Sequence, residues 1–250
     1  MEQVIERPLL LIAGHGERGG AGDNARLASI AGKAGDLLAD WYVRHGVLSG
    51  SPSIEEALEA AGRRPVLVWP FFMCRGYFVD IALRRRIEAA DVDYDMLPEL
   101  GSSPLLVETA CRMLIANGSP VGGHVLVVAH GSGKGPESRL STERFSRALA
   151  NADGIGHVSC AFLEEPPFAA GQIAALPSGS ALVSLFAGDG LHGGQDMAAL
   201  IAESCRHDLN VVCPAVDIDA AVRFLTGTVA SYMSDSFPAR RYGARRAGAF

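Results

Sequence analysis

The chain has 250 residues, of which 48% are hydrophobic and 20% are charged, a composition that favours a folded protein of one large domain or two small ones. The formal net charge of −6 argues against a general nucleic-acid-binding protein, and no apolar run reaches the roughly 20 residues needed to cross a membrane. The acidic start of the sequence lacks a signal peptide's basic region, and the 5 cysteines form no CxxC pair. Both features are typical of a cytoplasmic protein with reduced, buried thiols.

Apolar runs alternate with helical patterns along the first half of the chain. Pro70 lies inside one apolar run and predicts that the regular strand stops near Trp69. Ser53 followed by Glu56 is typical of a capping box that opens a helix. The strands predicted here are Leu9–Ala13, Val43–Leu48, Val66–Met73 and Asp93–Leu97. The predicted helices are Asn24–Ala39, Ser53–Ala60, Ile81–Ala90 and Pro104–Ala116.

A segment rich in glycine and containing a proline, Asn117–Gly123, separates this half from a second half with the same order of elements. The strands predicted in the second half are Val125–Ala129, Val158–Leu163, Ala181–Phe186 and Asn210–Val216. Its predicted helices are Glu137–Leu149, Pro167–Leu176, Gly194–Cys205 and Ile218–Ser231. Strands that alternate with helices through short connections predict right-handed crossovers and a parallel sheet in each half.

Two similar α/β lobes are therefore predicted, each a flavodoxin-like domain with a parallel four-stranded sheet flanked by helices and the strand order 2-1-3-4. The N-terminal lobe is assigned to residues 1–119 and the C-terminal lobe to residues 120–233. Residues 234–250 contain four arginines among glycine and alanine, and we interpret them as a solvated basic tail.

The two halves repeat a strand that ends in a histidine. Leu10-Leu11-Ile12-Ala13-Gly14-His15-Gly16 recurs as Val125-Leu126-Val127-Val128-Ala129-His130-Gly131, a step of 130 − 15 = 115 residues. At that step Ser49 corresponds to Glu164, and Tyr77 corresponds to His192. The second half therefore has polar groups that the first half lacks. This indicates a duplication in which one half carries the chemistry and the other supports it.

Three polar residues of the second half follow its first three strands. His130 follows the first strand, Glu164 the second, and His192 comes shortly after the third. In the strand order 2-1-3-4 these strands are neighbours, so their carboxyl ends bring the three residues to one edge of the sheet. Two imidazoles and a carboxylate suit a divalent first-row metal ion, and they can also accept protons near neutral pH. The other four histidines are interpreted as structural or surface residues: His45, His124, His157 and His207.

Glycine-rich loops precede a helix in both halves, after His15 and after His130. Neither loop has the GxxxxGK[ST] spacing of a phosphate-binding loop, which counts against a nucleotide-binding protein. Glycines there either form tight turns or allow the backbone to approach a large flat ligand closely.

The motifs together resemble the class II chelatases of tetrapyrrole biosynthesis, in particular the two-lobed sirohydrochlorin cobalto- and ferrochelatases. The segments of the second half that carry the resemblance are Ala129-His130-Gly131-Ser132, Ala161-Phe162-Leu163-Glu164…Pro167 and Gly190-Leu191-His192…Asp196. The matching segments of the first half are Gly14-His15-Gly16, Val47-Leu48-Ser49…Pro52-Ser53-Ile54, Gly76-Tyr77-Phe78-Val79-Asp80-Ile81 and Leu100-Gly101…Pro104. The resemblance covers nearly the whole chain except the basic tail.

The first half departs from the family's pattern at two places. Ser49 stands where the family has a glutamate, and the second histidine is replaced by Tyr77, or by Phe78 if Gly76 is aligned with Gly190. A lone His15 is a poor metal site. The principal site is therefore predicted in the second half.

The resemblance implies an enzyme that inserts a divalent metal ion into sirohydrochlorin, with His130, His192 and Glu164 as catalytic and metal-binding residues. Fe²⁺, for sirohaem synthesis, is the favoured metal, and Co²⁺, for cobalamin synthesis, is the alternative. No redox cofactor or nucleotide is implied beyond the substrate metal. Since sirohydrochlorin carries many carboxylates, cationic groups should line its site. The candidate substrate-binding residues are Ser132, Lys134, His15 and Arg75.

A further interpretation from a different class stays open at this point. A non-catalytic carrier of metal or tetrapyrrole could use the same fold, because fold does not dictate function. Tight stoichiometric binding with slow turnover would distinguish it from an enzyme.

Overall fold

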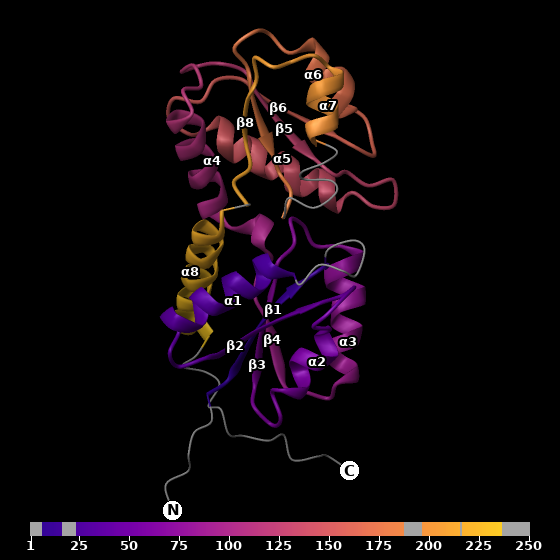
Figure 1. Ribbon diagram of the computed structural model, residues 1–250, viewed down its shortest axis with the longest axis vertical. Helices are drawn as coiled ribbons and strands as arrows, with labels where there is room; N and C mark the ends of the chain where they lie inside the picture. Colours follow the sequence, from indigo (N-terminus) through magenta and orange to yellow (C-terminus); the bar gives the residue numbers. More distant parts are fainter. Residues whose placement is uncertain (1–6, 17–23, 188–196, 216, 237–250) are drawn as a thin grey trace, which may run out of the picture.

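The computed structural model describes residues 7–16, 24–187, 197–215 and 217–236. They form two α/β lobes, shown one above the other in Figure 1. The first lobe is built on a sheet with the order β2-β1-β3-β4, and the second on a sheet with the order β6-β5-β7-β8. All strand pairs in both sheets are parallel. The predicted fold class and strand order are confirmed.

The central strands of both sheets are buried on both faces, as their continuous apolar sequence requires. In the first half the strands are β1 (Leu9–Gly14), β2 (Tyr42–Val47), β3 (Val66–Pro70) and β4 (Tyr94–Met96). In the second half they are β5 (Val125–Ala129), β6 (Val158–Phe162), β7 (Ala181–Ser184) and β8 (Asn210–Val212).

Helices connect the strands in the predicted order. The helices of the first half are α1 (Ala25–Leu37), α2 (Ile54–Glu59), η1 (Tyr77–Leu83), α3 (Arg84–Ala89), η2 (Leu100–Ser102) and α4 (Pro104–Ala116). Those of the second half are α5 (Glu137–Ala150), α6 (Ala169–Ala175), α7 (Met197–Glu203) and α8 (Ile218–Ser236). The predicted capping box at the start of α2 is present, with Ser53 and Glu56 bonding reciprocally.

Three predictions from the sequence need correction. The helix expected at Ile81–Ala90 begins earlier, at Tyr77, because its first part is the π-helix η1, whose wider turn does not follow the 3.6-residue period. The strands β7 and β8 are shorter than expected. The cysteines were expected to be buried, but four are half-buried and Cys205 is exposed, and all five are free thiols. The start of the helix expected at Gly194–Cys205 lies outside the described residues.

The last helix of each half covers the sheet of the other half. Helix α8 packs along α1 of the first lobe, while α4 packs against β8 and α5 of the second lobe (Figure 1). Two hydrogen bonds join α8 to the first lobe. Lys33 on α1 donates to the Asp219 carboxylate at 2.5 Å, and the Tyr232 hydroxyl donates to the Asp95 carboxylate at 2.6 Å. The lobes therefore exchange helices. The chain division at residues 119 and 120 stays a prediction.

This exchange produces a core that is continuous between the lobes. One cluster of buried side chains contains Leu10 and Trp69 of the first sheet, Val127 of the second sheet, and Phe224 of α8. Two smaller clusters lie on the opposite faces of the two sheets. Within the described residues, no helix is both long enough and apolar enough to cross a membrane.

We expect α8 to stabilise the whole molecule through its buried face. Phe224→Ala should lower the free energy of unfolding by about 3–5 kcal/mol, because Phe224 is 1% exposed and its truncation leaves a cavity. Arg223→Ala, at the exposed neighbouring position of the same helix, should change it by less than about 0.5 kcal/mol. Urea unfolding of the two variants measures the difference. Equal stability of the two variants would show that α8 does not contribute to the core.

Candidate functional site

His130 lies where β5 ends, at the carboxyl edge of the second sheet. Its Nδ1 is 3.0 Å from the carbonyl oxygen of Gly131. Because a carbonyl only accepts hydrogen bonds, Nδ1 carries the proton in this contact. The backbone thereby selects the tautomer whose Nε2 can accept a proton or bind a metal ion.

Glu164 follows the neighbouring strand β6 and lies beside His130 at this edge. Its backbone N–H donates to the His130 carbonyl oxygen at 3.0 Å, and its side-chain Oε1 lies 3.6 Å from His130 Nε2. The two side chains are 37% and 55% exposed, so a ligand can reach both. An exposed pair of this kind adds little to stability.

His192, the third predicted member, lies outside the described residues. Among the residues that the structure places, no group of three or more histidine, cysteine, aspartate or glutamate side chains could hold a metal ion. His130 and Glu164 are thus brought together as predicted, and the role of His192 stays a prediction.

Glu165 organises the loop that carries the site, and sequence reasoning did not single it out. Its Oε1 accepts from the Ser132 backbone N–H at 3.0 Å, and its Oε2 accepts from Arg139 at 2.6 Å. Arg139 also donates to the Pro166 carbonyl oxygen and lies over the Phe162 ring. The feature of the sequence that could have identified Glu165 is its position as a second carboxylate immediately after Glu164. The Arg139 guanidinium is therefore already paired with the Glu165 carboxylate.

Gly131 is required by the backbone of this loop. Its φ of +74° falls in the left-handed region, and an added Cβ would lie 2.8 Å from Glu165 Cγ. In the first half, Gly16 has a φ of +96°, and its Cβ would lie 1.9 Å from the Ser49 carbonyl oxygen. Both glycines therefore serve tight turns packed on their own chain.

The first half has the same backbone frame without the same side chains. Ser49 N–H donates to the His15 carbonyl oxygen at 2.9 Å, the counterpart of the bond from Glu164 to His130. His15 Nδ1 lies 3.3 Å from the Gly16 carbonyl oxygen, again as in the second half. The first half-site therefore differs from the second in side-chain chemistry and not in main-chain geometry.

Strand register fixes the alignment between the third strands of the two halves. Phe71 N–H donates to the Ala13 carbonyl oxygen, and Leu185 N–H donates to the Val128 carbonyl oxygen, both at 2.8 Å. The acceptors are 128 − 13 = 115 residues apart, but the donors are 185 − 71 = 114 residues apart. The third strands therefore correspond at a step of 114.

A step of 114 assigns Phe78, and not Tyr77, to the sequence position of His192, since it also aligns Gly76 with Gly190. Phe78 contacts His15 edge-on, with ring centroids 4.6 Å apart and an interplanar angle of 85°. An aromatic ring thus lies against His15 in the first half-site.

The remaining candidate substrate-binding residues lie on both lobes. Ser132 is half-buried in the loop after His130, where its hydroxyl accepts from the Lys134 backbone N–H at 3.1 Å. The Lys134 side chain is exposed. Arg75 forms a 2.6 Å ion pair with Asp80 that partly neutralises it, and the same carboxylate accepts from the Gly76 N–H.

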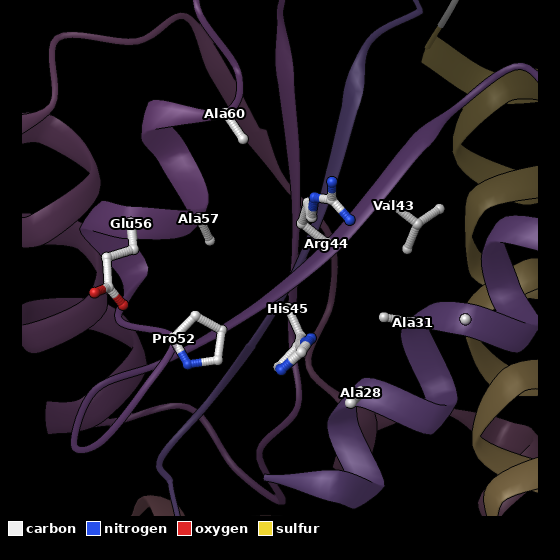
Figure 2. Close-up of a pocket in the computed structure, with 10 residues that line it drawn as sticks. Ala28, Ala31, Val43, Arg44, His45, Pro52, Glu56, Ala57 and Ala60 are labelled. Carbon is white, nitrogen blue, oxygen red and sulfur yellow. The ribbon is translucent and has the colours of Figure 1, made fainter. Parts of the chain in front are cut away.

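A cavity of about 430 Å³ lies elsewhere, at the free edge of β2. Figure 2 shows it between the helices α1 and α2, with His45 on the strand between them. Burial, followed by the nearby Arg44 charge, holds the pKa of His45 below its ordinary value. The His45 Nε2 is buried with no hydrogen-bond partner among the residues that the structure describes. None of the predicted site residues that the structure describes lines this cavity.

Comparison with known proteins finds a family model that matches part of the first half. Residues 9–116 match the sequence model of the CbiX family. No curated protein matches the chain. The matched half is the one whose polar set is incomplete, so the placement of the principal site in the second half rests on its residues and not on this match.

Solved structures share the fold along almost the whole chain. CbiX, described as the terminal enzyme of sirohaem biosynthesis in denitrifying bacteria, matches with a TM-score of 0.74 and 24% identity over 88% of this chain and 99% of that one. SirB from Bacillus subtilis with Fe³⁺ matches with a TM-score of 0.74 and 14% identity over 92% and 98%.

The sirohydrochlorin chelatase SirB from Bacillus subtilis subspecies spizizenii, in complex with cobalt, also matches, with a TM-score of 0.74 and 13% identity over 93% of this chain and 98% of that one. At these identities the structural matches show the fold alone. The match of residues 9–116 to the CbiX model agrees with the resemblance to class II chelatases that the motifs indicate.

The shared backbone frame predicts that the first half-site can be rebuilt. Ser49→Glu with Phe78→His would place a glutamate and a second histidine around His15, and we expect the number of Co²⁺ ions bound per chain to rise by about one. Titration calorimetry with Co²⁺ measures this. Ser49→Gln with Phe78→Leu is the matched control and should bind as the unaltered chain does. Unchanged stoichiometry in the first variant would contradict the equivalence of the two frames.

Proposed function

We propose that this chain, whose residues 9–116 match the CbiX family model, is a chelatase that inserts a divalent metal ion into sirohydrochlorin. The observation that carries the proposal is the pairing of His130 Nε2 with Glu164 Oε1 at 3.6 Å on the carboxyl edge of the second sheet. Imidazole and carboxylate together provide ligands for a divalent ion and acceptors for the protons that leave the macrocycle.

His130 is suited to hold the incoming metal ion. Its Nδ1–H is engaged by the Gly131 carbonyl oxygen, so Nε2 presents the lone pair at the exposed edge. An imidazole binds a first-row metal ion firmly and releases it to a ligand with more nitrogen donors. In our proposal His192 completes this set from the third strand of the second half.

Glu164 is suited to remove protons. Metal insertion releases two pyrrole protons. The Glu164 carboxylate can accept one, and His130 Nε2 can accept the other once the metal ion has left it for the macrocycle. The exposure of both side chains gives these protons a path to water. The reaction needs no net oxidation or reduction, so the two groups account for its proton balance.

Lys134 is the cation that we assign to the substrate's carboxylates. It lies on the loop that follows His130, and its side chain is exposed. Arg139 and Arg75 are less suited, because each already faces a carboxylate of its own lobe. Attraction between Lys134 and a carboxylate would orient the macrocycle on the edge that bears His130.

Fe²⁺ is our favoured metal and Co²⁺ the alternative. SirB structures contain Fe³⁺ in one case and cobalt in another, so proteins of this fold accept both elements. The ligand types do not separate the two, since histidine and carboxylate bind both ions.

Metal-insertion rates test the function directly. We expect the purified protein, under anaerobic conditions with sirohydrochlorin, to accelerate the absorption change of metal insertion at least about 100-fold with Fe²⁺ or Co²⁺. The ion with the higher kcat/KM identifies the physiological preference. If neither ion reacts faster than it does without protein, the chelatase assignment is wrong. Tight stoichiometric binding in that case would favour a carrier.

The two half-sites should respond unequally to loss of their histidines. His130→Ala is expected to lower kcat about 100-fold or more, because it removes a metal ligand and a proton acceptor. His15→Ala should have a much smaller effect, since Ser49 stands at the position that corresponds to Glu164. His207→Ala, at an exposed turn, serves as the control and should leave the rate unchanged. Equal losses from His130→Ala and His15→Ala would contradict a single active half.

A further inference from the structure

An exposed apolar surface lies beside His15 in the first half-site. Tyr77, Phe78 and Ile81 of η1 are 65%, 46% and 48% exposed, and we call these three residues the aromatic platform. Single exposed apolar residues are common and need no explanation. Three large ones in one short helix form a contiguous apolar patch, and such patches are typical of binding surfaces. Tyr77 and Ile81 are four residues apart and so lie on one side of η1.

Contacts between aromatic rings hold the aromatic platform in place. Phe78 stacks on the buried Phe72, with ring centroids 6.5 Å apart and an interplanar angle of 14°. Tyr77 meets Phe78 edge-on at 5.6 Å. A surface that is already ordered loses little conformational entropy when a ligand binds to it.

The start of η1 is fixed by charged groups. The Asp80 carboxylate accepts from the Gly76 N–H at 3.0 Å and pairs with Arg75 at 2.6 Å. Gly76 also packs against the second lobe, because a Cβ added to it would lie 3.6 Å from Glu137 Cβ in the first turn of α5. The platform therefore begins where the first lobe meets the helix that follows the His130 loop.

Phe78 occupies the position that corresponds to His192, and it packs its ring against His15. A phenyl ring cannot bind a metal ion or accept a proton. The contact also makes His15 part of an aromatic group, in which a histidine ring adds flat surface. The loss of polar residues from this half-site is thus accompanied by a gain of flat apolar area.

We propose that the aromatic platform binds the flat face of the tetrapyrrole macrocycle, with His15 as part of that surface and not as a metal ligand. The inference rests on the proposed function. Aromatic rings bind a flat conjugated ligand by offset or edge-on stacking. The first half-site thereby positions the substrate, and the second half-site performs the chemistry.

Removing the platform should weaken binding of the macrocycle without altering the His130 and Glu164 side chains. Tyr77→Ala with Ile81→Ser alters two exposed side chains, so the fold should persist. We expect the Kd for metal-free sirohydrochlorin, from an absorption titration, to rise about tenfold or more. In metal insertion the loss should fall on KM and not on kcat. Ile115→Ser, at a 63% exposed site on α4, is the matched control and should bind as the unaltered chain does.

The outcomes separate this inference from the proposed function. An unchanged Kd in the Tyr77→Ala, Ile81→Ser variant overturns the platform even if metal insertion proceeds. A raised Kd supports the platform even if the unaltered chain inserts no metal, in which case the enzyme assignment alone fails. If the unaltered chain does not bind sirohydrochlorin, both are overturned. Dimers of the unaltered chain that the variant abolishes, seen by sedimentation, would assign the platform to a second copy and overturn the inference.

Discussion

The main-chain hydrogen bond from Glu164 N–H to the His130 carbonyl oxygen is the contact on which the site depends. It forms because β5 and β6 are neighbours in a parallel sheet, and it brings together two residues that are 34 positions apart. The equivalent bond from Ser49 to His15 persists in the first half. A backbone frame of this kind tolerates any side chain that leaves the turn intact, so the two halves could diverge in chemistry without losing the fold.

The exchange of α4 and α8 determines how the two half-sites relate. Each helix is covalently part of one half and buries its apolar face on the other, so the lobes share one core cluster. Ser141 on α5 adds a hydrogen bond to the Met73 carbonyl oxygen at 3.0 Å. Packing of this extent fixes the relative positions of the lobes. A polar half-site and an aromatic half-site are thereby held in one molecule, as a ligand with a flat apolar ring and an ionisable centre would require.

The sequence predicted the strands well because a strand buried on both faces is a continuous apolar run, and β1 and β5 are such runs. It missed the start of η1 because a π-helix has no 3.6-residue period and is opened here by the Asp80 carboxylate. The helix exchange was not predicted either. An amphipathic pattern indicates that a helix has a buried face, but it does not indicate which sheet that face will cover.

The sequence by itself determined the α/β class, the strand order, and the adjacency of His130 and Glu164, because these follow from apolar runs and from residues at strand ends. It left open whether Tyr77 or Phe78 corresponds to His192. Only the tertiary structure gives the step of 114 that favours Phe78, because a one-residue difference in pairing between β1–β3 and β5–β7 leaves no trace in composition or periodicity. The tertiary structure alone also placed Phe78 against His15 and Glu165 beneath the His130 loop, since both contacts join residues distant in the chain.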